Sequence, residues 1–253
     1  MAGISLHDLI STLIVILFLL VMFIAWLMGK NKKMPPYANP EGYERIDELM
    51  HRSSEEGKAL LMGLGEGFSG LNGSLGDQTS LMVQRILMSR SVFNDQPAQS
   101  YSGDGALACI SQMIVHGAYD KAMAVELFRP EHNQLTGLSG LSWMAGLLPE
   151  LARSDNTGLV LAGSLRPESL IITDMAERKE IPVVAATGDI SGQAALFASG
   201  APVLLGEDYY LPAIGDINQA SYQHSARVLN LFRILLAAGL LLAAFLKLSG
   251  VLP

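Results

Sequence analysis

Residues 158–206 read GLVLAGSLRPESLIITDMAERKEIPVVAATGDISGQAALFASGAPVLLG, and this stretch decides the fold. Its continuous apolar segments are predicted strands, at 158–163, 182–186 and 202–206. Segments with helical spacing lie between them, at 167–178 and 190–199. Asp189 is a typical N-cap for the second helix, and Gly200 a typical stop. Apolar strands that alternate with short helices indicate a parallel sheet covered on both faces.

The chain before this stretch continues the alternation. The predicted strands there are 59–62, 97–101 and 124–128. The predicted helices are 42–56, one that starts at an N-cap Asp77, 105–123 and 138–152. Six strands with helices between them predict one α/β domain with a Rossmann-like parallel sheet, which we place at residues 34–227.

Two apolar runs flank this domain. Residues 9–28 carry no charge, and about 20 helical residues span the hydrocarbon core of a bilayer. A secretory signal peptide is the alternative, but no basic residue precedes the run and no Ala-x-Ala site follows it. The second run, 228–252, contains Arg233 and Lys247, and its alternative is a helix lying on the membrane. Because 235–245 is apolar all round, we expect both runs to be transmembrane helices.

Basic residues indicate the orientation of these two helices. Lys30, Lys32 and Lys33 follow the first run, and no basic residue precedes it. Arg227 and Arg233 lie before the second run. The positive-inside rule therefore predicts a two-pass protein with a cytoplasmic domain and both termini outside.

The composition excludes several classes of protein. Half of the residues are hydrophobic and only 16% are charged, which is unusual for a soluble enzyme. Residues 34–227 carry 12 basic and 23 acidic side chains, so nucleic acid is not an expected partner. The bilayer is an expected partner, and the acidic domain is expected to face the cytosol or another protein.

A glycine-rich loop follows the 59–62 strand. Gly65, Gly67 and Gly70 form a G-x-G-x-x-G pattern and are candidate ligand-binding residues. In a dinucleotide site this pattern opens directly into a helix, whereas here the loop continues to Gly76 and Glu66 adds a negative charge. We therefore favour a plain glycine-rich loop at the carboxyl edge of the sheet, packed against a neighbouring subunit.

Other candidate ligand-binding residues follow predicted strands. They are Asp104, Gly163, Ser164, Asp189, Glu207 and Asp208. The carboxyl ends of parallel strands share one edge, where ligands bind and where carboxylates hold divalent cations. The alternative, which we favour, is that Asp104 and Asp189 are helix caps and that the other carboxylates are solvated.

Recognisable catalytic chemistry is absent from the sequence. It contains no phosphate-binding G-x-K-[ST], no G-x-S-x-G and no H-E-x-x-H, and its five histidines lack metal-ligand spacing. The single cysteine, Cys109, is predicted to lie in the core. We predict no catalytic residue, metal site or cofactor.

Several short motifs are shared with a known family of proteins: Arg45, 64–67, 162–164, Glu168, 197–200, 205–210 and Arg233. On these residues the chain resembles a family of uncharacterised bacterial, Chloroflexi-type, membrane-anchored proteins catalogued as a domain of unknown function. Family members usually have Glu-Glu-Leu-Tyr where this chain has Glu207-Asp208-Tyr209-Tyr210. The resemblance implies a location in the bacterial inner membrane and supplies no reaction.

Two functions are compatible with these features. The first is a non-catalytic, membrane-tethered scaffold that forms a homo-oligomer or joins a larger membrane complex. The second is a small-molecule or nucleotide-binding module, or a weak hydrolase, that uses the glycine loop and the carboxylates at the sheet edge.

Overall fold

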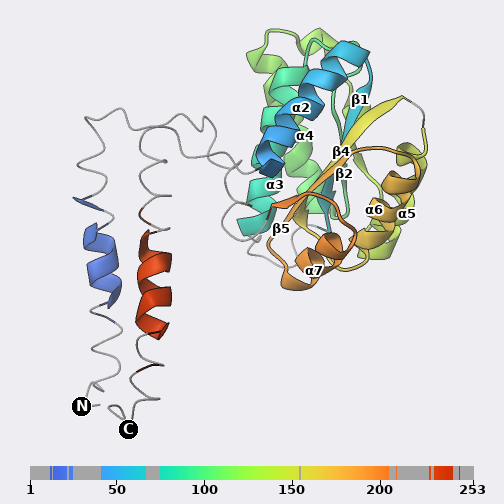
Figure 1. The fold of residues 1–253 in the computed structure, drawn as a ribbon. Coiled ribbons are helices and arrows are strands. Elements are labelled where there is room, and N and C mark those ends of the chain that lie inside the picture. Colours follow the sequence, from blue (N-terminus) through green and yellow to red (C-terminus); the bar gives the residue numbers. More distant parts are fainter. Residues whose placement is uncertain are drawn as a thin grey trace. The chain divides into compact units, whose positions relative to one another are not determined.

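The computed structural model describes residues 12, 14–21, 23–24, 41–66, 75–153, 155–204, 209, 228, 231–241 and 245 (Figure 1). The chain forms two compact units. The sheet unit comprises residues 39–215, and the terminal unit comprises residues 1–38 and 216–253.

A six-stranded parallel sheet organises the sheet unit, in the order β3-β2-β1-β4-β5-β6. Its strands are β1 (Ala59–Gly65), β2 (Gln99–Ser102), β3 (Asn133–Leu135), β4 (Asn156–Ser164), β5 (Val183–Thr187) and β6 (Val203–Leu204). This is the strand order of the Rossmann fold. The predicted α/β class and parallel sheet are therefore confirmed.

Helices cover both faces of the sheet (Figure 1). One layer contains α2 (Glu41–Glu56), α3 (Leu75–Ser91) and α4 (Gly105–Lys121), and the other contains α5 (Gly140–Leu151), α6 (Ser169–Arg178) and α7 (Ile190–Ala198). In β1, Leu60, Met62 and Leu64 join the first core while Leu61 joins the second. Burial on both faces is the reason that β1, β4 and β5 are continuous apolar segments in the sequence.

One predicted strand is wrong. Residues 124–128 contain the 3-10 helix η1 (Val125–Leu127), whose valine and leucine are 43% and 48% exposed. The third strand, β3, follows a second 3-10 helix, η2 (Pro130–His132). Asn133 of β3 accepts buried hydrogen bonds from Ser100 at 2.9 Å and from Ser111 at 2.6 Å. Polar contacts position this strand, so apolar periodicity does not reveal it.

Two predictions about single residues are also wrong. Asp77 lies inside the first turn of α3, which begins at Leu75, and is not its N-cap. Cys109 is exposed, because the buried face of α4 passes through Leu107 and Ser111 instead.

The terminal unit contains helical residues 14–21, 23–24 and 231–241. The rings of Phe18 and Phe232 meet edge to face at 4.8 Å between centroids, so these two helical segments lie side by side (Figure 1). Among the residues that the structure describes, no helix is long and apolar enough to cross a membrane.

Candidate functional site

The carboxyl ends of β1 and β4 form the candidate site. These strands are neighbours, and Gly65 pairs with Ser164 at their ends. The crossover connections lead away from this point to opposite sides of the sheet, toward β2 and toward β5. Open parallel sheets bind their ligands at such a switch point.

Two glycines allow the strand ends to come close. Gly65 and Gly163 have φ values of +77° and +138°. A Cβ atom at Gly65 would lie 2.6 Å from the carbonyl oxygen of Ser164, and one at Gly163 would overlap the Leu64 carbonyl oxygen. The Glu66 amide also donates to the Ser164 carbonyl at 3.2 Å. Contact between the strands therefore accounts for both glycines.

Charged side chains meet above the strand ends. The guanidinium of Arg166 lies 3.2 Å from the carboxylate of Glu66. Partial burial raises the pKa of Glu66; Arg166 opposes this shift, while Glu168 and Asp189 add to it. A Cβ atom at Gly140, the first residue of α5, would overlap the Glu66 carboxylate and lie 2.7 Å from that of Glu168. Carboxylates therefore outnumber the single guanidinium near Glu66, which favours cations and hydroxyl groups over phosphates.

The amino end of α3 holds a carboxylate from the chain itself. Asp77 is fully buried in its first turn and accepts a 2.7 Å hydrogen bond from the Ser164 hydroxyl. Nearby, the Tyr209 hydroxyl donates to the Gly76 carbonyl at 2.5 Å. In dinucleotide-binding domains the corresponding helix end faces the pyrophosphate. Here the side chain of Asp77 lies at that helix end.

The structure brings part of the predicted site together. Gly65, Gly163 and Ser164 lie at the switch point, and Asp189 is close enough to affect the pKa of Glu66. Predicted residues Gly67, Gly70, Glu207 and Asp208 lie outside the described residues. Sequence reasoning missed Arg166, although a charged residue between a strand end and the next helix was an available signal.

Asp104 and Asp189 are helix caps. Asp104 accepts from the Leu107 amide at 2.9 Å, at the start of α4. Asp189 accepts from the Ser191 amide at 2.8 Å and from the Gly192 amide at 3.1 Å. The hydrogen bond from the Ser191 side chain contributes most to the lowered pKa of Asp189. The capping interpretation is confirmed for both.

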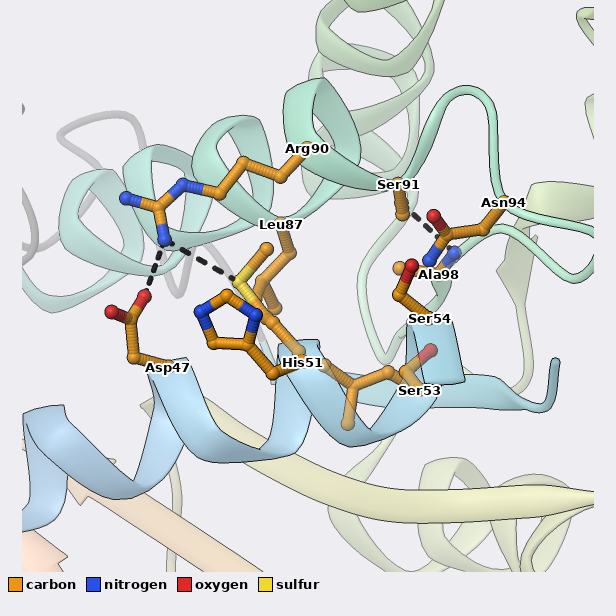
Figure 2. Close-up of a pocket in the computed structure, with 11 residues that line it drawn as sticks. Asp47, His51, Ser53, Ser54, Leu87, Arg90, Ser91, Asn94 and Ala98 are labelled. Carbon is orange, nitrogen blue, oxygen red and sulfur yellow. Dashed lines mark hydrogen bonds and ion pairs between the residues drawn. The ribbon is translucent and has the colours of Figure 1, made fainter. Parts of the chain in front are cut away.

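A small cavity lies between α2 and α3, away from the switch point (Figure 2). Its volume is about 150 Å³, and Leu60, Leu87 and Ala98 are among the residues that line it. Figure 2 shows His51 beside the ion pair between Arg90 and Asp47. These charged groups already satisfy one another, which weakens the case for a ligand.

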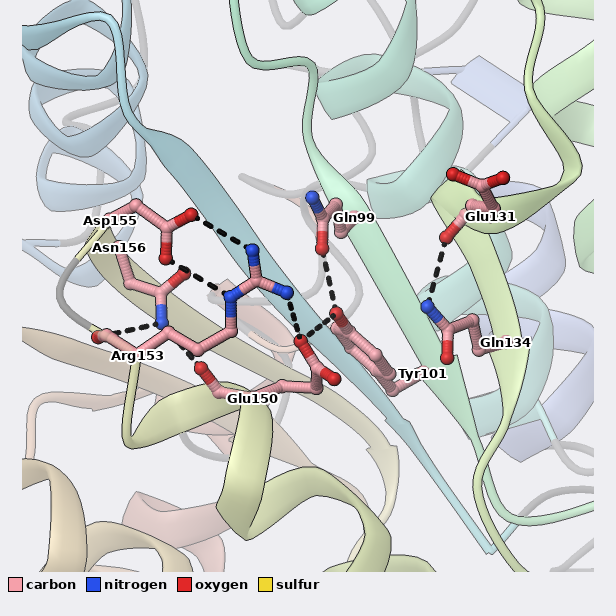
Figure 3. Close-up of polar contacts among 8 residues, drawn as sticks. All are labelled: Gln99, Tyr101, Glu131, Gln134, Glu150, Arg153, Asp155 and Asn156. Carbon is pink, nitrogen blue, oxygen red and sulfur yellow. Dashed lines mark hydrogen bonds and ion pairs between the residues drawn. The ribbon is translucent and has the colours of Figure 1, made fainter.

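A larger polar groove, of about 430 Å³, lies near the starts of β2 and β3. Arg153 there lies 3.1 Å from Asp155 and 3.3 Å from Glu150 (Figure 3). The Tyr101 hydroxyl donates to Gln99 at 2.7 Å, and burial raises the Tyr101 pKa. Since ligands of this fold bind at the opposite, carboxyl edge, the switch point remains the better candidate.

Comparisons with protein-family models, curated proteins and solved structures give no match. Within the described residues, no group of three or more His, Cys, Asp or Glu side chains has a geometry that could hold a metal ion. The functional argument therefore depends on the fold and on its surfaces.

Proposed function

We propose that this protein is a membrane-tethered, non-catalytic α/β domain that assembles into a homo-oligomer or a larger membrane complex. The observation that carries this proposal is the set of large apolar side chains that the sheet unit exposes on helices and loops of both layers. Among the described residues of this unit, the most exposed are Phe93 (73%), Met113 (74%), Met123 (90%), Leu138 (77%), Ile190 (83%) and Phe197 (72%). Exposed apolar side chains mark sites of interaction where several of them lie together.

The switch point supports a non-catalytic role. The chain places Asp77 at the amino end of α3 and pairs Glu66 with Arg166 above the strand ends. A nucleotide phosphate would meet these carboxylates where Rossmann domains normally offer free amide groups.

The terminal unit supports attachment to a membrane through residues 9–28 and 228–252. Its described helical residues expose apolar side chains, including Leu19 (60%), Phe23 (59%), Leu240 (72%) and Leu241 (73%). Lipid would cover this surface. Basic residues follow the first run, and by the positive-inside rule they favour the cytoplasmic side. The arrangement that we propose is therefore a two-pass protein of the bacterial inner membrane, with a cytoplasmic domain and both termini outside.

The mass of the full chain in lipid nanodiscs tests assembly. Light scattering with correction for lipid should give a multiple of the 27.1 kDa chain mass. A mass of one chain across the accessible concentration range would overturn the homo-oligomer.

A second candidate function is binding of a small polar or cationic molecule at the switch point. The excess of carboxylates there favours it, since Glu66 pairs with Arg166 while Glu168 and Asp189 lie close enough to raise the pKa of Glu66. Thermal unfolding of the full chain with nucleotides, divalent ions and polyamines tests this function. A ligand at about 100 times its Kd stabilises by about 2.7 kcal/mol, so a library without effect would exclude this function for the compounds it contains.

A further inference from the structure

The outer face of helix α4 is apolar over residues 106–113, whereas His116, Asp120 and Lys121 are exposed toward its carboxyl end. Leu107, Ser111, Val115, Ala118 and Tyr119 point inward. On the outer side, Met113 is 74% and Ile110 is 37% exposed, and Cys109 and Ala106 are also exposed. A helix that covers a sheet normally presents a polar face to water.

Helix α2, in the same layer, shows the usual arrangement. Its exposed residues include Glu44, Arg45, Glu48 and Arg52. The two helices therefore differ within this layer, although α7 of the other layer also exposes Ile190 and Phe197. A partner is expected to cover the apolar part of the α4 face.

We propose that this face packs against α4 of a second copy, antiparallel, with a two-fold axis at Met113. This inference rests on the proposed assembly role and names its surface. Met113 is the central residue of α4, which runs from Gly105 to Lys121. Residues 106, 109, 110, 113, 116, 117 and 120 lie along one side of the helix, and reversal of the helix about position 113 exchanges these positions among themselves. Lys121 is also exposed, and the same reversal places it beside the start of the partner's helix. A self-complementary patch is the requirement for a two-fold interface.

Small side chains permit close approach in this geometry. Cys109 of one copy lies opposite Gly117 of the other, and nothing lies within 4 Å of a Cβ atom built at Gly117. Ile110 lies opposite His116, and the two Met113 side chains meet at the axis. Methionine adapts its shape easily, so it suits a contact with itself.

The charges at the ends of α4 favour the antiparallel pairing. It places Asp120 against the first turn of the partner's helix, where the dipole favours negative charge. It also places Lys121 near Asp104, which caps the start of the partner's helix. A parallel pairing would instead bring like charges together.

The same charges disfavour a lipid surface as the occupant. Helices that lie on membranes carry several basic residues along their polar face. Lys121 is the only Lys or Arg of α4, and Asp104, Asp120 and Glu126 lie at or near its ends. An anionic leaflet would repel this surface.

One helix face covers less than the roughly 800 Å² per partner of a standard interface. Met123, 90% exposed just after α4, extends the face. Two membrane attachments confine the copies to one plane and limit their orientations, which raises the effective concentration for a small contact. The association is therefore expected for the full chain in a bilayer.

Disulfide formation in vesicles tests the pairing. The full chain is reconstituted in phosphatidylethanolamine and phosphatidylglycerol and then oxidised with copper phenanthroline. Cys109→Ser provides the background, since Cys109 is the only cysteine. Met113→Cys is compared with Phe197→Cys, because these positions are 74% and 72% exposed. Circular dichroism and thermal unfolding confirm that both variants fold.

The expected result is at least tenfold faster dimer formation for Met113→Cys than for Phe197→Cys. The wild-type chain should also cross-link more slowly than Met113→Cys, because its two Cys109 thiols would be about 12 Å apart along the helix axis. Equal cross-linking rates at positions 113 and 197, in a chain whose mass shows an oligomer, would show that α4 is not the contact surface. The proposed assembly role would then still hold. A monomeric mass would overturn both the contact surface and the homo-oligomer. A third measurement attaches a fluorophore to the thiol of Met113→Cys. If brominated lipid quenches its fluorescence, the face lies on the bilayer, and the pairing is overturned.

Discussion

Ser164 at the end of β4 donates a 2.7 Å hydrogen bond to Asp77, which is fully buried in the first turn of α3. The two residues are 87 positions apart in the chain. Their contact joins the switch point to the helix whose amino end would otherwise attract an anion. This hydrogen bond connects two parts of the fold at the position where dinucleotide-binding Rossmann domains hold phosphate.

We expect Asp77→Ala and Ser164→Ala to be coupled. Each substitution removes a partner from a buried hydrogen bond, so each should lower the free energy of unfolding by about 1–3 kcal/mol. The double variant should lose less unfolding free energy than the two single variants lose together, because each single variant already breaks the same hydrogen bond. Denaturant unfolding in detergent measures the cycle. Asp104→Ala is the control, since this cap bonds Leu107 and should be additive with Ser164→Ala. Strict additivity for Asp77 would show that the bond contributes nothing.

Gly163→Ala should be strongly destabilising. The φ value of +138° and the overlap with the Leu64 carbonyl oxygen combine backbone strain with a steric clash. Strain alone costs about 1–3 kcal/mol. Gly117→Ala is the matched control, because its Cβ meets nothing within 4 Å in the middle of α4. It should be neutral or stabilise the monomer by up to about 1 kcal/mol. Equal effects of the two substitutions on denaturant unfolding would contradict the strand contact at the switch point.

The pKa of Glu66 predicts a dependence of stability on pH. Burial raises this pKa above its ordinary value of 4.5, so the folded state holds the proton more tightly than the unfolded chain does. The stability from this group is present below pH 4.5 and is lost as the pH rises through the folded pKa. Glu66→Gln should therefore be more stable than the wild type at pH 7 and lose that advantage toward pH 4. Loss of the ion pair has little weight, because Arg166 is 57% exposed. Denaturant unfolding at a series of pH values measures the difference in unfolding free energy between Glu66→Gln and the wild type. A difference that favours the variant less at pH 7 than at pH 4 would contradict the prediction.

Asn133→Ala should destabilise the edge of the sheet. Its side-chain oxygen accepts from Ser100 and Ser111, and its amide group donates to the Ala108 carbonyl at 3.0 Å. Loss of several buried partners should cost about 2–4 kcal/mol. Hydrogen exchange should accelerate in β3 and β2 before β4. Gln134→Ala, on the same strand but more exposed, is the control and should change little.

The same residues show what the sequence could and could not predict. Strands β4 and β5 were predictable because both of their faces are buried, which produces uninterrupted apolar segments. Strand β3 was not, because Asn133 is held by side chains from β2 and α4 that only the fold brings near. Asp189 was predictable as a cap because its partners are two and three residues away. Asp77 was wrongly predicted to be the N-cap of α3, because its hydrogen-bond partner, Ser164, is distant in the sequence.

The orientation in the membrane is testable with a single thiol on the sheet unit. The Cys109→Ser, Phe197→Cys chain carries this thiol at an exposed position on α7, outside the proposed α4 contact. A membrane-impermeant maleimide should label it in inverted inner-membrane vesicles and not in spheroplasts, if this unit is cytoplasmic as the positive-inside rule predicts. Ala2→Cys in the same background is the matched control and should show the reverse pattern. Labelling of Phe197→Cys in sealed spheroplasts would reverse the proposed topology. Labelling of positions 2 and 197 from the same side of the membrane would contradict the proposal that residues 9–28 cross it.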